Sequence, residues 1–468
     1  MHQCHLMLKL TNYGLLLLTM TVLVSCKNDD APYTAYLEGK ISNLGVNYII
    51  LSKDNRIIDT LYLDEENHFY KKFDSLAPGL YSFKHEPDYQ YVYFEKNDSI
   101  NLTFDAVNFN ESLTFNGRGS EKNNFMMQEY LANESDNTRL RDIYNDNNTS
   151  FLKTAGANYK SHLESYTRKK KKLRWSKDFD FYAKARLDFE FYTQKEHYPY
   201  VHELHTHENI RKDLPENYYA YRKDISFNDP RLLYFSPFTR YLNAMLTNMA
   251  FAKKYDNSAP KDKSLRENIE KLRIADSVFT DERIKNVVLD NIAFAYILED
   301  RNIENNEQFL DEYVKLSSVN DDNEIKKMGK AIKLLKPGKE IPAIALTDDT
   351  NKSFSIAKDL KKETVVFFWT ACARIQLDIV QQKVIALRKS HPEVNFIAIN
   401  IDDTTQWKRM LDEYHFRGIH PLHAENFDEL KYKWVFTKIN RTIILNPDGT
   451  IKNAFTNLMD PKFTEFLK

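Results

Sequence analysis

The chain has 468 residues, 42% of them hydrophobic and 13% aromatic, so it can bury several cores and does not have the composition of a disordered protein. Its 66 Lys and Arg balance 67 Asp and Glu, and this net charge of -1 argues against nucleic acid or anionic membranes as partners recruited by bulk charge. With 11 glycines and no phosphate-binding motif, no cofactor is expected.

Residues 1–26 have the pattern of a bacterial signal peptide. Lys9 precedes an apolar run from Leu15 to Val24, which is too short to span a bilayer as a stable anchor. Leu23-Val-Ser-Cys26 follows at once and resembles the lipobox of bacterial lipoproteins, in which the cysteine becomes the lipidated first residue. The resemblance implies a palmitate-bearing Cys26 that holds the protein on the membrane.

The residues that follow Cys26 indicate where in the cell envelope the protein is expected. Lys27-Asn-Asp-Asp30 resembles a surface-display tag of some Gram-negative lipoproteins, so we expect the outer membrane, with the protein facing the periplasm or the cell surface. An ordinary secretory signal with a coincidental cysteine is the alternative. Because Cys4 lies in the leader, Cys372 is the one free thiol expected in the mature chain, and no internal disulfide is predicted.

Residues 31–119 predict a β-sandwich, because short alternating runs recur between turn residues. The domain is either a spacer that holds the rest of the protein off the membrane or a ligand-binding module. The predicted strands are 36–41, 48–51, 57–62, 68–73, 79–83, 91–94, 99–104 and 112–115.

Residues 120–335 predict a helical domain. Leu265, Ile269 and Leu272 recur at four and three residues, which marks one face of a helix, and a second helix is expected around 287–293. Prolines at 215, 230, 237 and 260 mark helix starts or loops.

A dense basic run, Arg168-Lys-Lys-Lys-Lys172, lies in this helical region. It could contact phosphates or an acidic partner. We expect a solvated helix face instead, because Glu164, Asp178 and Asp180 border the run and the net charge is balanced.

Histidines and glutamates gather close by and could in principle bind a metal. No zinc-binding spacing is present, so we predict no metal site and place these histidines in a loop near Pro199. A smaller set around Pro421 is expected in a loop between a helix and the next strand. The residues are His197, His202, His205 and His207 with Glu196, Glu203 and Glu208, and then His415, His420 and His423.

Residues 336–468 predict an α/β domain. Thr364–Trp369 is apolar on both faces and predicts a buried strand, and 394–399 predicts a second. Between them, Leu377, Val380, Val384 and Leu387 form one helical stripe. A hairpin across 446–449 and a closing helix over 461–468 complete the set.

This order of elements, with a cysteine-bearing turn after the first strand, Pro342 upstream and Asn446-Pro-Asp-Gly449 downstream, resembles the thioredoxin fold of TlpA-type thiol-disulfide oxidoreductases. The sandwich resembles the small domain often found ahead of it. Two departures matter. Dithiol members carry two cysteines separated by two residues, whereas Cys372 is followed at that spacing by Ile375, and Asn440 stands where the family has a cis-proline beside its active site.

Three hypotheses of function follow. The first is an envelope lipoprotein whose domain has lost dithiol chemistry and now binds an envelope protein partner or has a structural role. The second is a monothiol thiol-disulfide oxidoreductase or peroxidase-like enzyme, in which Cys372 near Arg374 is the nucleophile. The third is an accessory of carbohydrate or peptide uptake, for which a ligand groove lined with exposed aromatic side chains would be expected.

Overall fold

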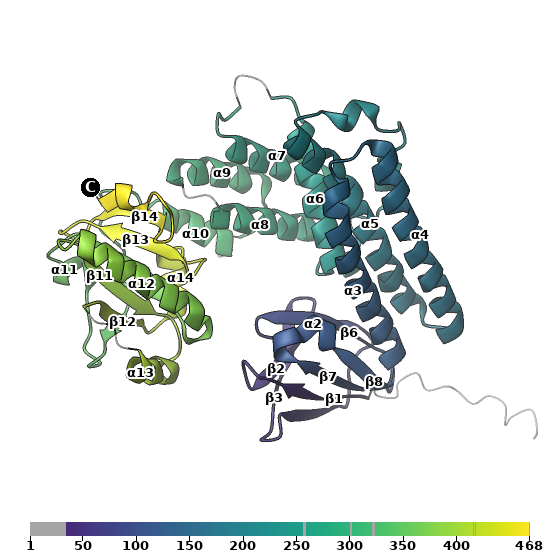
Figure 1. Ribbon diagram of the computed structural model, residues 1–468, viewed down its shortest axis with the longest axis horizontal. Coiled ribbons are helices and arrows are strands. Elements are labelled where there is room, and N and C mark those ends of the chain that lie inside the picture. Colours follow the sequence, from purple (N-terminus) through teal and green to yellow (C-terminus); the bar gives the residue numbers. More distant parts are fainter. Residues whose placement is uncertain are drawn as a thin grey trace, which may run out of the picture. The chain divides into compact units, whose positions relative to one another are not determined.

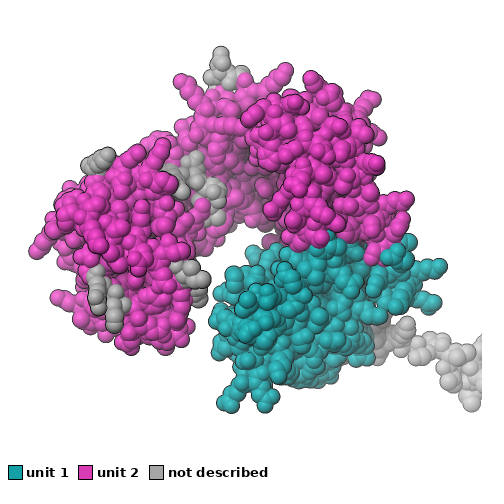
Figure 2. Space-filling view, viewed as in Figure 1, with its two compact units in different colours: residues 1–132, 166–183 teal, residues 133–165, 184–468 magenta. Residues whose placement is uncertain are grey.

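The computed structural model describes residues 34–255, 259–299, 302–320, 323–414, 416 and 418–467. The predicted signal peptide and the predicted lipidation residue, Cys26, lie outside the described residues. Two compact units are present (Figure 2): residues 1–132 with 166–183, and residues 133–165 with 184–468. In chain order, β-sheets come first, then helices, then an α/β domain (Figure 1), which confirms the predicted multidomain fold class.

All eight predicted strands of the amino-terminal domain form. They pair into two four-stranded sheets, with orders β4-β1-β7-β8 and β3-β2-β5-β6, and β1 pairs in parallel with β7 but antiparallel with β4. The strands are β1 (Ala35–Ser42), β2 (Tyr48–Lys53), β3 (Arg56–Tyr62), β4 (His68–Phe73), β5 (Gly79–His85), β6 (Asp88–Phe94), β7 (Ser99–Asp105) and β8 (Thr114–Arg118). A short helix, α2 (Phe109–Ser112), precedes β8.

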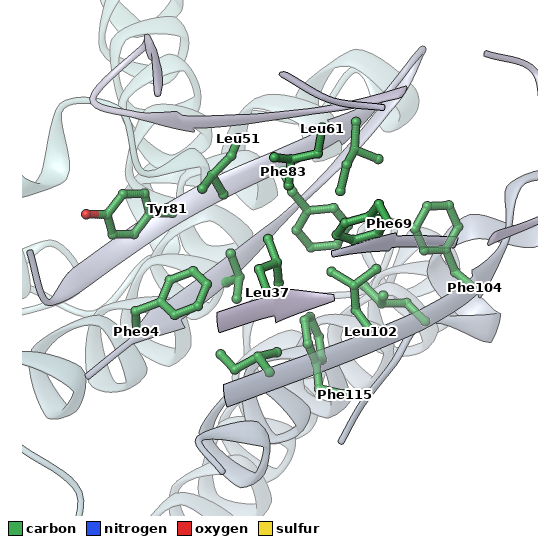
Figure 3. Packing of buried hydrophobic residues seen from close by; sticks show 14 of the residues in the cluster. Leu37, Leu51, Leu61, Phe69, Tyr81, Phe83, Phe94, Leu102, Phe104 and Phe115 are labelled. Atoms are coloured by element: carbon green, nitrogen blue, oxygen red, sulfur yellow. The ribbon is translucent and has the colours of Figure 1, made fainter. Parts of the chain in front are cut away.

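The two sheets enclose one aromatic-rich core, because alternate residues of each strand point inward. Leu51 and Phe83 from one sheet and Leu37 and Leu102 from the other are fully buried, and Figure 3 shows them meeting in the same layer. Phe83 contacts Phe115 edge to face, with ring centroids 6.2 Å apart. The sandwich is therefore held by aromatic packing, as the alternating pattern predicts.

The middle of the chain is helical, as predicted. Leu265, Ile269 and Leu272 are buried on one face of α7, and Val288 and Leu289 are buried on α8. A second core packs Phe151 of α4 on Tyr198 of α5, with stacked rings 4.0 Å apart. The helices are α3 (Ser120–Ile143), α4 (Asn148–Leu173), α5 (Lys177–Thr206), α6 (Ser236–Ala252), α7 (Lys263–Val278), α8 (Glu282–Glu299), α9 (Ile303–Leu316) and α10 (Glu324–Ile332).

The carboxy-terminal domain is built on a six-stranded sheet of order β14-β13-β10-β11-β12-β9. Its central strand β10 is buried on both faces, pairs in parallel with β11 and antiparallel with β13, and so confirms the predicted buried strand. The strands are β9 (Leu346–Asp348), β10 (Thr364–Trp369), β11 (Asn395–Asn400), β12 (His420–Ala424), β13 (Arg441–Leu445) and β14 (Ile451–Asn457).

Helices cover both faces of this sheet. The predicted stripe of α12 (Arg374–Ser390) packs on one face with Trp407 of α13 (Thr404–Glu413), while Phe368 on the other face contacts Trp434, which follows α14 (Phe427–Lys433). A one-turn helix, α11 (Ile356–Asp359), precedes β10. The segment leading into the domain joins the hairpin, because the Gly338 N–H donates to the Ile451 carbonyl over 2.7 Å.

Two predictions for this domain were wrong. The predicted closing helix is a short 3-10 helix, Phe463–Leu467, whose Phe463 and Leu467 side chains are buried in the core of the domain. His420 and His423 lie in strand β12 and not in a loop, because pairing with β11 and β9 fixes this segment as extended chain. His415 lies outside the described residues. Among the described helices, none is long and apolar enough to cross a membrane.

Candidate functional site at the end of strand β10

The candidate site is the turn between β10 and α12, where the sequence places its cysteine. The turn is a single 3-10 helix, Ala371–Ala373, and α12 begins directly after it at Arg374. Cys372 occupies the middle of this turn, and its side chain is outside what the structure describes. The position agrees with the predicted helix start, whereas the reactivity of the thiol stays a prediction.

One carboxylate holds the turn in place. Asp402, two residues beyond the end of β11, accepts a hydrogen bond from the backbone N–H of Ala371 over 2.6 Å and another from the hydroxyl of Thr370. The side-chain amide of Asn400 donates to the same carboxylate over 2.9 Å. Because β10 and β11 are parallel, their carboxyl ends meet at one edge of the sheet, which brings Asp402 to the turn.

A buried histidine, His423, contacts the backbone of Asp402. Nε2 of His423 lies 2.8 Å from the backbone carbonyl of Asp402, and its ring stacks on Trp407 with an interplanar angle of 11°. Trp407 also contacts Trp369, the last residue of β10, with ring centroids 5.8 Å apart. His423 is 4% exposed, so its ring has a packing role, with no metal-binding group around it among the described residues.

Arg374 forms an ion pair with another helix. Its guanidinium lies 3.0 Å from the carboxylate of Glu413 on α13, and both side chains are substantially exposed. Nη2 also lies 3.7 Å from the sulfur of Met410. An arginine already neutralised by a carboxylate is a weaker electrostatic activator of a neighbouring thiol than a free cation would be.

An open apolar cleft of about 710 Å³ lies beside the turn. The turn contributes Ala371 and Ala373, helix α12 contributes Ile379 and Val380, and Met459 closes the cleft from the segment after β14. Ile379 is 52% exposed and Met459 42% exposed. The cleft therefore presents apolar side chains to solvent next to the position of Cys372.

Asn440, the position that corresponds to the family's cis-proline, is exposed and directly precedes β13. The one cis peptide bond among the described residues lies elsewhere, at Glu86-Pro87. Beside Asn440, the buried side chain of Arg441 donates to the carbonyls of Val435 over 3.0 Å and Ala454 over 3.1 Å. Burial lowers the pKa of Arg441 to about 9. This arginine fixes the loop that leads into Asn440.

His197, His202 and His205 lie on helix α5, which corrects the loop prediction for them because α5 continues through Pro199, whereas His207 follows the end of the helix. Nδ1 of His202 lies 2.9 Å from the carbonyl oxygen of Tyr144, and Nδ1 of His205 lies 2.9 Å from the amide oxygen of Asn145. Within the described chain, no three histidine, cysteine or acidic side chains are grouped as metal ligands.

Two glutamates of that cluster, Glu196 and Glu203, bind neighbouring side chains of the helical region. The fully buried carboxylate of Glu196 accepts hydrogen bonds from Arg222 over 2.8 Å, Tyr221 over 2.6 Å and Asn248 over 2.7 Å. Burial and the neighbouring Glu196 raise the pKa of Tyr221 far above its ordinary value. Glu203 pairs with Arg211 over 2.7 Å. These groups form a structural network in the helical region.

The basic run, residues 168–172, lies in the last turns of α4. Its side chains are mostly exposed, which agrees with the predicted solvated face. Lys170 pairs with Asp180 over 2.7 Å.

Sequence analysis missed Asp402 and His423 as parts of the site. A polar Asn-Ile-Asp sequence at the carboxyl end of a parallel strand was the available signal, because ligand sites and active sites gather at that edge.

Comparison with known proteins agrees with this geometry. Residues 361–451 match the family described as thioredoxin-like. A search of curated proteins found no match. The carboxy-terminal domain is therefore a thioredoxin-like domain.

Similar solved structures include the thioredoxin domain of a thiol-disulfide oxidoreductase from Bacteroides vulgatus, 17% identical, covering 29% of this chain and 99% of that one, with a TM-score of 0.24. A thioredoxin-like protein from Bacteroides caccae is 14% identical and covers 52% of this chain and 88% of its own, with a TM-score of 0.34. A thiol:disulfide interchange protein from a Bacteroides species is 18% identical and covers 25% and 79%, with a TM-score of 0.22.

Proposed function

We propose that this protein, which carries a thioredoxin-like domain at residues 361–451, is a lipid-anchored protein of the bacterial envelope that binds an envelope protein partner through that domain. The anchor is Cys26. The domain does not run a two-cysteine redox cycle, because Cys372 has no second cysteine at the spacing of a dithiol motif.

The observation that carries the proposal is the apolar cleft beside the turn. A dithiol enzyme would carry a reactive cysteine pair at this edge of the sheet, whereas here Cys372 is a single cysteine, Asp402 fixes the turn and Arg374 is paired with Glu413. What remains at the turn is an apolar surface with Ile379 and Met459 exposed at its sides. Such a surface suits an extended peptide segment with apolar side chains.

The test is capture of partners in cells. A photo-crosslinking amino acid at Ile379 should capture an envelope protein, and Met459→Asp should weaken that capture at least tenfold without changing thermal unfolding. A matched control, Ile385→Asp, alters another exposed residue of α12 that is absent from the cleft lining. Equal capture by the parent and the Met459→Asp variant would sink the proposal.

The monothiol enzyme is separated from this proposal by the chemistry of Cys372. The alkylation rate of Cys372 against pH, measured in the chain from Lys27 onward with Cys372→Ser as the blank, gives the thiol pKa. A pKa near the ordinary value of about 8.5 supports the binding role. Fast alkylation with a pKa well below that value favours the monothiol enzyme and directs the search to a resolving thiol on another molecule.

A role in carbohydrate uptake is favoured by one observation in the sandwich. Tyr62 and Tyr89 are 69% and 46% exposed on the outer face of the sheet β3-β2-β5-β6, and Tyr48 packs edge to face on Tyr62. Flat tyrosine surfaces of this kind stack on sugar rings. Glycan binding by the parent that is lost in Tyr62→Ala would support this second function, and an equal response of the two proteins would contradict it.

A further inference from the structure

A second cavity lies inside the helical region, apart from the turn at Cys372. Helices α6, α7 and α8 pack together there (Figure 1) and line a half-open cavity of about 230 Å³. Each helix contributes one face: α6 contributes residues at 239, 242, 243 and 246, α7 contributes 268 and 271, and α8 contributes 288, 291, 292 and 295. The spacing of three and four residues places each set on a single stripe.

The walls of this cavity are apolar. Leu242, Leu246 and Val288 are 5%, 2% and 5% exposed, and they form the buried part of the lining. Leu233 and Ile292 extend the apolar surface. A ligand with a hydrocarbon body would lose its contact with water here and gain dispersion contacts on several sides.

The polar groups of the lining are one ammonium, three amides and the Thr239 hydroxyl. Lys271 is the one charged side chain among the eleven lining residues, and Asn243, Asn268 and Asn291 are the amides. The Asn268 amide donates to the carbonyl of Ser264 over 2.9 Å, so part of its hydrogen-bonding capacity is already occupied.

Lys271 has no carboxylate paired with it in the described part of the chain. Glu267, one turn earlier on α7, attracts it electrostatically but lies 3.9 Å from Lys263. Burial lowers the pKa of Lys271, because the ammonium loses hydration in the cavity. A half-buried cation that forms no ion pair is stabilised by an anion that enters the cavity.

We propose that this cavity binds a small apolar carboxylic acid, with its hydrocarbon part against Leu242, Leu246 and Val288 and its carboxylate on Lys271. The size supports this class, because 230 Å³ lies below the roughly 300–1,000 Å³ typical of pockets for drug-sized ligands. The site is separate from the proposed partner-binding function, which uses the thioredoxin-like domain.

The experiment is calorimetric titration of the chain from Lys27 onward, which keeps every described residue, with octanoate and with octanamide. The parent should bind octanoate more tightly than octanamide. Lys271→Met keeps most of the side-chain volume and removes the charge, so it should weaken octanoate binding at least tenfold and leave octanamide binding within twofold. Lys212→Met, at an exposed lysine of the same region, should match the parent.

A second variant checks the location independently. Ala295→Phe adds bulk at the exposed rim of the cavity and should abolish binding of both ligands, while circular dichroism confirms that the variant is folded. Any one of three results would overturn the proposal: no octanoate binding by the parent, unchanged octanoate affinity in Lys271→Met, or unchanged binding in Ala295→Phe.

Discussion

Replacing Asp402 by alanine should destabilise the thioredoxin-like domain and loosen the turn that carries Cys372. The carboxylate accepts from the Ala371 N–H over 2.6 Å, from the Asn400 amide over 2.9 Å and from the Thr370 hydroxyl. A hydrogen bond to a charged group contributes about 1.5–3 kcal/mol. Since these bonds share one acceptor, are not additive and are half-exposed, we expect a loss of about 2–4 kcal/mol in the free energy of unfolding.

The adjacent carboxylate provides the matched control. Asp403 is exposed and caps α13 by accepting from the N–H groups of Thr405 over 2.9 Å and Gln406 over 3.0 Å. Its replacement by alanine should cost about 1 kcal/mol, the usual value for a lost N-cap. Asp402→Asn keeps one oxygen acceptor, so its stability should fall between those of the parent and Asp402→Ala.

Two assays separate a local effect from a global one. Urea unfolding followed by tryptophan fluorescence reports mainly on this domain, because three of the four tryptophans, Trp369, Trp407 and Trp434, lie in it. Hydrogen exchange measured on peptides covering 370–376 reports on the turn itself and should accelerate in Asp402→Ala. The argument fails if Asp402→Ala and Asp403→Ala give the same midpoint and the same exchange at the turn.

Other predictions concern two glycines and one half-buried lysine. In Gly39→Ala the new Cβ would lie 2.5 Å from the backbone oxygen of Leu102, so thermal unfolding should show a loss of about 1–3 kcal/mol. Gly156→Ala on α4, where nothing lies within 4 Å, should instead stabilise the chain by about 0.5–1 kcal/mol, and equal effects of the two changes would refute both. Burial lowers the pKa of Lys195 to about 8, so the folded chain loses a proton that the unfolded chain keeps up to 10.5. The unfolding free energy should therefore rise between pH 8 and 10.5, and an unchanged slope in Lys195→Met would contradict this.

The strands and helices that could be predicted are those whose apolar period is visible along the chain. Strand β10 is apolar from Val365 to Trp369 and is buried on both faces, and the stripe from Leu377 to Leu387 is buried on α12. In both cases the local pattern and the tertiary environment demand the same conformation.

The predictions failed where tertiary contacts override the local pattern. β12 contains Pro421 and two histidines, so its sequence looks like a loop, yet pairing with β11 and β9 makes it a strand. Pro199 removes a hydrogen bond from α5, yet the helix continues because neighbouring Tyr198 stacks on Phe151.

Only part of the candidate site could be predicted from the sequence. Cys372 could be placed at a helix start because the strand before it is a continuous apolar run and the helix after it has a periodic apolar stripe. The role of Asp402 depends on which strand lies next to β10, and the spacing of residues does not encode that neighbour. Parallel pairing of β10 with β11 supplies this information.

The position of β1 has a mechanical consequence. The strand begins at Ala35, nine residues after Cys26, and fully extended chain of that length reaches about 30 Å. Under the proposed lipid anchor, tension on the protein would enter along β1, which is hydrogen-bonded to β4 on one side and β7 on the other. Both ladders would then have to shear together, which resists force far better than unzipping a single edge strand, so the attachment point lies on a strand suited to bearing load.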